Sequence, residues 1–235
     1  MPKIYVLQFP FFVGLKTNTS TLIHILSKEQ SLISEFLREL RDKDIQKDRA
    51  RFRKNIERIG QIAAFELSKE MEYKIVFTQS PLGIAQVRTL AEQPIIATIL
   101  RAGLPLQKGI SDMFDQADLA YISAYRKHKN DTEFEIVLEY FATPDINDRI
   151  VILCDPMLAT GQSLVQTYQA ILKRGTPKKV YLVSVIGSQQ GVDYVTENIP
   201  NADLWIGVID EKLDKHGYII PGLGDAGDLS FGEKL

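Results

Sequence analysis

A series of short apolar runs, separated by segments with a helical pattern, constrains the fold of this chain more than any other feature. Because nearly every residue within each run is apolar, both faces of the corresponding strand must be buried, which is typical of a parallel sheet covered by helices. Segments 106–114 and 163–173 have helical patterns. We therefore predict an α/β fold with a mostly parallel central sheet flanked by helices. The predicted strands are Ile95–Leu100, Ile150–Cys154 and residues 119–124, 180–186 and 204–209.

A long amphipathic segment precedes these strands. From about residue 44 to residue 71, the residues Phe52, Ile56, Ile59 and Ala63 recur at helical spacing on one face. Several basic residues of this segment lie largely elsewhere. They could contact an anion, although a solvated helix face is the simpler interpretation. These basic residues are Arg49, Arg53, Lys54 and Arg58.

No repeat or linker divides the chain, so we predict a single domain over residues 1–235, with residues 1–40 as an N-terminal arm. Residues 74–83 indicate a short strand followed by a turn. Residues 132–140 alternate apolar and polar side chains, which predicts a half-exposed antiparallel strand or hairpin arm. The last segment, residues 217–235, is rich in Gly and Asp and shows little regular period.

Composition narrows the class of protein. With 235 residues, 45% hydrophobic residues and 25% charged residues, the chain can bury a sizeable core. The net charge of −2 gives no reason to expect a nucleic-acid partner. No apolar run approaches the roughly 18 residues of a membrane span, and the N-terminus reads poorly as a signal peptide. The single cysteine, Cys154, excludes an internal disulfide, so we expect a cytoplasmic protein without a membrane partner.

The segment from Val151 to Leu164 starts as a strand and ends as the first turn of a helix. A carboxylate, Asp155, stands at the carboxyl end of the strand, where ligands bind in open α/β sheets. The N–H groups at the start of the next helix could bind a phosphate, and Thr160 and Ser163 add hydroxyl groups. Asp155 could accept hydrogen bonds from a vicinal diol, so phosphate plus diol suggests a ribose 5-phosphate. A plain strand-turn-helix, in which Ser163 is only a helix cap, explains the same residues equally well.

Three motifs together carry a resemblance to a known family. The run D-P-M-L-A-T-G-Q-S, residues 155–163, resembles the phosphoribosyl-diphosphate motif of type I phosphoribosyltransferases, and its Asp-Pro start resembles that of uracil phosphoribosyltransferases. The run I-L-R-A-G-L at residues 99–104 is similar to the pyrophosphate-side loop of that family. The run H-G-Y-I-I-P-G-L-G-D-A-G-D at residues 216–228 is similar to its uracil-binding segment. The resemblance covers roughly residues 40–234.

This resemblance implies the type I phosphoribosyltransferase fold, which adds a small hood and an antiparallel β-arm to the sheet. Residues 132–140 and 74–83 are expected to form the hood. The implied reaction is uracil plus 5-phosphoribosyl 1-diphosphate giving UMP plus pyrophosphate, a step of pyrimidine salvage. Positive charge grows on the ribose as the C1–O bond breaks, so positioning and electrostatics should supply most of the rate.

The resemblance also assigns residues to the diphosphate substrate. Arg101 and Arg126 are expected to contact the diphosphate, because a planar guanidinium binds two phosphate oxygens at once. On its own pattern, Arg126 reads as a surface arginine at a strand end. Asp155, Arg101 and Asp225 are the implied catalytic residues. The implied phosphoribosyl-diphosphate site comprises Arg101, Arg126, Asp155, Pro156, Met157, Leu158, Ala159, Thr160, Gly161, Gln162, Ser163 and Asp225.

The C-terminal segment is implied to read the base. Main-chain groups at Ile219, Gly224 and Ala226 would complement the acceptor-donor-acceptor edge of uracil. Asp225, also implied to bind uracil, matches a family position near the reacting centre that touches the phosphoribosyl substrate. Cytosine would leave a buried polar group unpaired, at about 1–3 kcal/mol per lost contact. A disordered tail is the alternative, but the apolar residues among the glycines disfavour it.

Mg²⁺ is the implied metal, bound through the substrate phosphates rather than by a dedicated set of protein ligands. The resemblance further implies a homodimer or homotetramer and GTP binding, although the sequence shows no site for either. The polar stretch 127–131 is either a mobile flap or a solvated turn. Three positions depart from the family pattern: Pro105, Gln162 and the pair Leu229-Ser230.

Two alternatives on the same fold remain open from the sequence. One is an RNA-binding regulator of pyrimidine genes, which would need a basic face for the RNA backbone. The net charge and the complete uracil segment weigh against it. The other is a catalytically inert paralogue that binds UMP.

Overall fold

A mostly parallel sheet forms the centre of the structure, which is a computed structural model that describes residues 21–128 and 134–234. The strand order is β1-β10-β9-β7-β4-β5-β6, and β5–β6 is the antiparallel pair among these neighbours. The strands are β1 (Ile23–Ile25), β4 (Ile95–Leu100), β5 (Asp118–His128), β6 (Phe134–Ala142), β7 (Ile150–Cys154), β9 (Lys179–Ser188) and β10 (Asp203–Asp210). The predicted parallel sheet is confirmed.

The apolar strands are buried on both faces, as their sequences require. In β7, Val151 and Leu153 pack into one core cluster, whereas Ile152 and Cys154 pack into the other. Successive side chains of a strand point to opposite faces, so a run without polar residues serves two cores at once. The sheet therefore separates two apolar layers.

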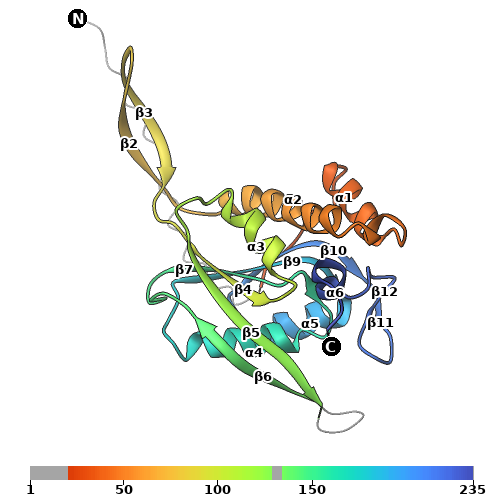
Figure 1. Cartoon of the computed structure of the whole chain (residues 1–235). Coiled ribbons are helices and arrows are strands. Elements are labelled where there is room, and N and C mark those ends of the chain that lie inside the picture. The colour runs from red at the N-terminus through yellow and green to blue at the C-terminus, as the bar shows by residue number, and fades with distance from the viewer. Residues whose placement is uncertain (1–20, 129–133, 235) are drawn as a thin grey trace, which may run out of the picture.

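Helices cover both of these layers (Figure 1). The first three helices contribute to one core cluster, and α4 and α5 contribute to the other. The bounds are α1 (Leu32–Arg41), α2 (Arg49–Ser68), α3 (Leu104–Ser111), α4 (Gln162–Leu172) and α5 (Gln189–Asn198), with a short 3-10 helix at Ile45–Lys47. The predicted helix over residues 44–71 begins at residue 49, because the Asp48 side chain accepts hydrogen bonds from the N–H groups of Ala50 and Arg51.

Residues 21–40 are integrated into the domain. β1 pairs with β10, and α1 buries Ile33, Leu37 and Leu40 in the core. The spacing of these three residues is the signal of an amphipathic helix, which the interpretation of residues 1–40 as an arm did not use. Residues 1–20 lie outside the described part of the chain.

A long hairpin of β2 (Tyr73–Ser80) and β3 (Gly83–Leu90) projects away from the body (Figure 1). It leads into the amino end of β4, whereas ligands of such sheets bind at the carboxyl ends of the strands. The expectation that residues 74–83 help to cover the substrates is therefore wrong. The β5–β6 pair extends beyond the last residue of β4, which is level with Ser123.

The C-terminal segment is ordered, although its sequence shows little period. It contains the small hairpin β11 (Lys212–Leu213) and β12 (Ile219–Ile220), followed by α6 (Ala226–Phe231). The Asp225 side chain caps α6 by accepting hydrogen bonds from the N–H groups of Gly227 and Asp228. Among the described helices, none combines the length and apolar character that a membrane span needs.

Candidate active site

Four polar residues lie along one edge of the sheet because the parallel strands all end there. Arg101 follows β4 and Asp155 follows β7. Ser188 is the last residue of β9, and Asp210 is the last residue of β10. This is the edge at which open α/β sheets bind ligands.

The turn after β7 folds back onto β9. The Pro156 carbonyl accepts hydrogen bonds from the N–H groups of Val185 at 3.1 Å and Ile186 at 3.0 Å. The short strand β8 (Met157–Leu158) then pairs with β9. Within the turn, Met157 N–H donates to Asp155 Oδ1 at 3.3 Å. These contacts fix the carboxylate at the mouth of the turn.

Gly161 lets the chain enter α4. Its φ of 76° is left-handed, and an added Cβ would lie 2.9 Å from the carbonyl oxygen of Gly191. Gln162, which departs from the family pattern, is the first residue of α4. Its backbone N–H is therefore available at the helix N-terminus, as phosphate binding requires.

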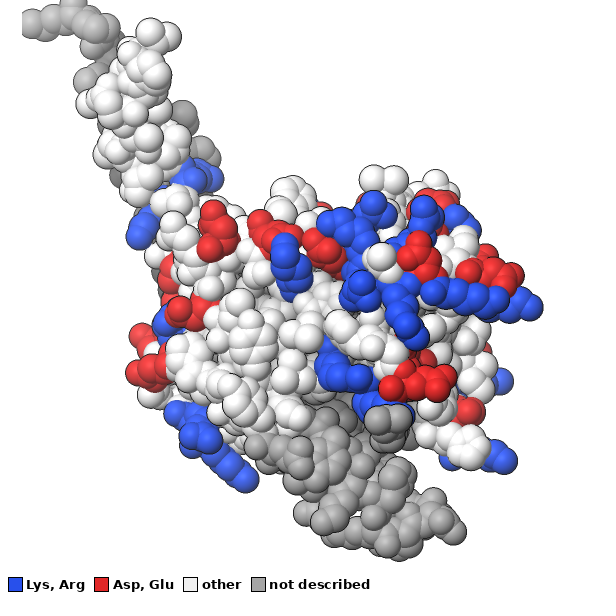
Figure 2. Space-filling model, viewed as in Figure 1, with Lys and Arg blue, Asp and Glu red and all other residues white. Residues whose placement is uncertain are grey.

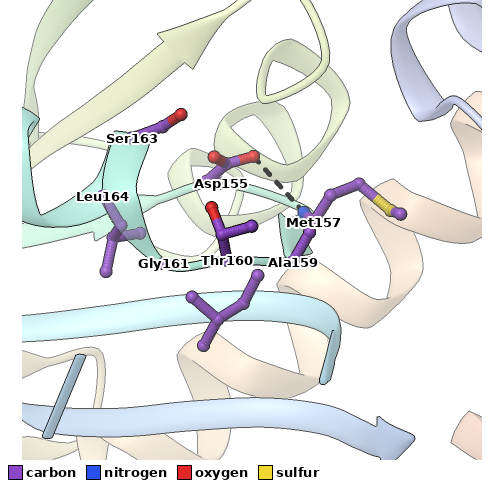
Figure 3. Close-up of a pocket in the computed structure, with 8 residues that line it drawn as sticks. Asp155, Met157, Ala159, Thr160, Gly161, Ser163 and Leu164 are labelled. Carbon is purple, nitrogen blue, oxygen red and sulfur yellow. Dashed lines mark hydrogen bonds between the residues drawn. The ribbon is translucent and has the colours of Figure 1, made fainter. Parts of the chain in front are cut away.

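A small pocket lies between this turn and the start of α4 (Figure 3). Oxygen atoms of Asp155, Thr160 and Ser163 point to the same side of the turn, whereas Leu164 points away from it. The residues that line the pocket are Asp155, Met157, Leu158, Ala159, Thr160, Gly161, Ser163 and Leu164. Seven of these eight belong to the expected set. Leu164 is new, and five residues of the expected set do not line the pocket: Arg101, Arg126, Pro156, Gln162 and Asp225.

Ser188 supports the turn from behind, and the sequence did not single it out. Its hydroxyl donates to the carbonyl of Ala159 at 2.6 Å and accepts from Gly191 N–H at 2.9 Å. Ser188 is fully buried, so each lost hydrogen bond would leave a backbone group without a partner. A serine directly before a helical pattern is a cap signal that could have found it.

The C-terminal segment reaches the same edge through Arg101. The Nη2 atom of Arg101 donates to Asp228 Oδ1 at 3.1 Å and to the carbonyl of Gly232 at 3.1 Å. Asp225, the cap of α6, stands three residues before Asp228. The structure therefore brings together two of the motifs, residues 99–104 and 216–228, that lie far apart in the sequence.

Asp210 anchors the turn that follows β12. Its Oδ2 atom accepts from Gly222 N–H at 2.8 Å and from Arg41 Nη1 at 2.8 Å, and its Oδ1 atom accepts from Arg41 Nη2 at 2.7 Å. Burial raises the pKa of Asp210, but the bonds from Arg41 and Gly222, together with the Arg41 charge, hold it below its usual value. Neither member of this ion pair was expected at the site.

The positions expected to read uracil surround that turn. Ile219 and Ala226 are buried, and Gly224 has a left-handed φ of 92°. The peptide bond between Ile220 and Pro221 is cis. These positions lie in one short stretch that runs from β12 to the start of α6. Asp210 binds this part of the chain at Gly222, and Arg101 binds it at Asp228 and Gly232.

Arg126 lies on β5, in the part that extends beyond β4, and its backbone is in register with Ile136 of β6. The strand thus carries Arg126 past the carboxyl edge of the sheet. Most of the polar stretch 127–131, interpreted as a flap or a turn, lies outside the described residues.

The basic residues of α1 and α2 are interspersed with acidic ones on their face of the molecule (Figure 2). Arg51 pairs with Glu39 at 2.9 Å, and Lys54 pairs with Glu57 at 2.8 Å. Arg53 is directed elsewhere, since its Nη1 atom donates to the carbonyl of Ser230 in α6 at 2.6 Å. Lys54 lies on a solvated helix face, as expected, whereas Arg53 makes a tertiary contact with α6.

Cys154 is packed in β7, as expected of a strand residue. Burial, with a further contribution from the Asp155 charge, raises the pKa of its thiol to about 12. The described residues contain no group of three or more His, Cys, Asp or Glu side chains that could hold a metal ion.

Comparisons with known proteins agree on one family. The sequence model of uracil phosphoribosyltransferase matches residues 27–233. A uracil phosphoribosyltransferase of Porphyromonas gingivalis is 49% identical over 215 residues, which cover 91% of this chain and 99% of the relative. One of Pyrococcus furiosus is 35% identical over 88% of this chain and 89% of the relative. The solved structure of the AQ2163 protein from Aquifex aeolicus superimposes with a TM-score of 0.80 at 29% identity, over 90% of this chain and 98% of that one.

Proposed function

This chain belongs to the uracil phosphoribosyltransferase family and transfers the phosphoribosyl group of 5-phosphoribosyl 1-diphosphate to uracil, and we propose that the pocket beyond β7 binds the ribose 5-phosphate. The products are UMP and pyrophosphate. The observation that carries this proposal is the convergence of Asp155, Thr160 and Ser163 at the N-terminus of α4, beside a C-terminal segment held by Arg101.

Backbone N–H groups at the start of α4 bind the phosphate. The partial positive charge at a helix N-terminus favours an anion, and the hydroxyls of Thr160 and Ser163 add donors. Gly161 allows the phosphate to approach the main chain closely. Asp155 accepts hydrogen bonds from the ribose diol. Holding the sugar at two points fixes the C1 atom against the incoming base.

Arg101 and Arg126 bind the diphosphate that leaves. Arg101 follows β4 and Arg126 lies on the extension of β5, so the two approach the same edge from neighbouring strands. Positive charge next to the departing oxygen stabilises the charge that develops as the C1–O bond breaks. Asp225 caps α6 three residues before Asp228, the partner of Arg101, and we assign it to the junction of sugar and base.

The main chain at Ile219, Gly224 and Ala226 reads the edge of uracil. A backbone carbonyl or N–H cannot change its character as a side chain can, so this mode of recognition is strict. Turnover of uracil should exceed that of cytosine, hypoxanthine and orotate, since each wrong edge leaves buried groups unpaired at roughly 1–3 kcal/mol apiece.

Mg²⁺ fits a site whose polar side chains are oxygen donors, namely Asp155, Thr160 and Ser163. We propose that the ion would bind through the substrate phosphates, with the carboxylates of Asp155 and Asp225 as the protein groups that would help to hold it. When bound, the ion neutralises part of the diphosphate charge.

The test mixes purified protein with Mg²⁺, 5-phosphoribosyl 1-diphosphate and labelled uracil, cytosine, hypoxanthine or orotate in parallel. UMP and pyrophosphate should form with uracil. No turnover with uracil would refute the proposal and favour an inert paralogue. Nothing in the structure or the comparisons favours an RNA-binding regulator, and a gel-shift with pyrimidine-operon leader RNA should show no complex.

We also propose a cytoplasmic homodimer or homotetramer that binds GTP. The β2–β3 hairpin supports association, because Phe77, Leu82 and Ile84 are 73%, 100% and 73% exposed, respectively. Large exposed apolar patches mark interaction surfaces. Sedimentation analysis would give the oligomeric state, and calorimetry with GTP would test nucleotide binding.

A further inference from the structure

The turn that connects β12 to α6 is held by an ion pair from distant parts of the chain. Arg41 ends α1 and Asp210 ends β10, and their side chains meet through two bonds of 2.7 and 2.8 Å. The exposed fractions of the two side chains are 25% and 7%, respectively. A bidentate pair shielded in this way has a defined geometry, unlike the exposed pairs on α2.

Both the N–H and the carbonyl of Gly222 form hydrogen bonds with this ion pair. Gly222 N–H donates to Asp210 Oδ2 at 2.8 Å, and Arg41 Nη1 donates to the carbonyl of Gly222 at 3.1 Å. Gly222 has a φ of 60°, and an added Cβ would lie 2.0 Å from the carbonyl oxygen of Ile219. The position therefore requires glycine, and the ion pair fixes it relative to the sheet.

We propose that Arg41 and Asp210 are positioning residues for uracil recognition, which they set by fixing Gly222 between the base-reading positions Ile219 and Gly224. Recognition by the main chain depends on where the main chain lies, so an anchor at the centre of the turn controls base affinity. The side-chain hydrogen bonds of the pair go to each other and to Gly222, and neither residue lines the phosphate pocket. Loss of the pair should therefore weaken binding of the base more than binding of the sugar phosphate. This inference rests on the proposed reading of uracil by residues 219–226.

The experiment compares Asp210→Asn and Arg41→Lys with the wild-type enzyme. Asp210→Asn keeps the shape but loses the charge and one acceptor, and Arg41→Lys cannot bind both carboxylate oxygens and the carbonyl of Gly222 together. We expect KM for uracil to rise roughly tenfold or more, with KM for 5-phosphoribosyl 1-diphosphate changed less than about twofold. The KM for uracil should rise more in Arg41→Met than in Arg41→Lys, because lysine retains one charged contact.

The control is the pair Arg149–Asp118, with 2.9 Å between Nη2 and Oδ2, at the amino ends of the strands. Asp118→Asn and Arg149→Lys should leave both KM values unchanged. Thermal unfolding of every variant ensures that kinetics are measured on folded protein; if Asp210→Asn does not fold, Arg41→Lys decides. Equal increases in both KM values, or no increase for uracil, would overturn the inference. Failure of the wild-type enzyme to use uracil would instead overturn the proposed function.

Discussion

Arg101 at the end of β4 forms an ion pair with Asp228 in α6, with 3.1 Å between Nη2 and Oδ1. This contact joins the residue proposed to bind the leaving diphosphate to the segment proposed to read the base. The two substrates react at the junction of their sites. The bonds from Arg101 to Asp228 and Gly232 link those two sites, and we propose that Arg101 serves both.

Replacing Arg101 by glutamine tests its part in diphosphate binding. Glutamine retains a donor for Asp228 or Gly232 but lacks the charge that stabilises the departing group. We expect kcat/KM to fall about 10²–10³-fold, with inhibition by pyrophosphate weakened more than inhibition by UMP. Arg149→Gln is the control and should leave kcat/KM and both inhibition constants unchanged. If Arg101→Gln kept the wild-type kcat/KM, Arg101 would have only a structural role.

Ser188→Ala tests the support behind the phosphate turn. The change leaves the carbonyl of Ala159 and the N–H of Gly191 without the partner they share, at about 1–3 kcal/mol in the free energy of unfolding. KM for 5-phosphoribosyl 1-diphosphate should rise more than KM for uracil, the reverse of the pattern expected for Asp210→Asn. Ser68→Ala, which removes an exposed hydroxyl on α2, provides the comparison. A larger effect on uracil would contradict this assignment.

Cys154 should be inert in the folded enzyme. Burial raises the pKa of its thiol to about 12, so the reactive thiolate is scarce, and the side chain donates to the carbonyl of Ala97 at 3.2 Å. Iodoacetamide at about pH 8 should label it only after denaturation. Rapid labelling of native protein, detected by mass spectrometry, would show that β7 opens far more readily than its packing indicates.

The Arg41–Asp210 pair also predicts how stability depends on pH. The folded-state pKa of Asp210 lies below the ordinary value of 3.8, so its stabilisation is fully present above that value and is lost as pH falls through the folded-state pKa. The difference in unfolding free energy between wild type and Asp210→Asn should therefore be constant near neutral pH and shrink below about pH 4. Urea titrations at several pH values measure it. A difference that persists undiminished in strong acid would argue against this ionised pair.

The sequence predicts the local parts of this architecture and leaves out the distant contacts. The strands β4 and β7 and the pocket after β7 follow from apolar runs and from a motif confined to residues 155–163. In contrast, Arg41 and Asp210 are 169 residues apart, and no spacing in the sequence relates them. Ser188 and Ala159 come together only because β8 pairs with β9. Such contacts arise from tertiary structure, which periodicity cannot encode.

The same limit explains why the sequence did not predict the helices at the two ends of the chain. The helix α1 has clear spacing of Ile33, Leu37 and Leu40, but it is short and follows a stretch of sequence with no regular period. The helix α6 is too short for a period to be visible, and the Asp225 cap and the packing against α2 hold it in place. The β2–β3 hairpin was recognised only by its first strand and turn, since β3 alternates weakly.

Three arginines, from α1, α2 and the turn after β4, each hold one carbonyl of the C-terminal segment: Arg41 that of Gly222, Arg53 that of Ser230 and Arg101 that of Gly232. All strands of the central sheet lie before this segment in the chain. During translation, the strands of the sheet are therefore made before the segment that we propose distinguishes one base from another. Ile219, Leu223 and Ala226 of that segment belong to the same core cluster as α2, so the chain completes this core and the proposed base site together.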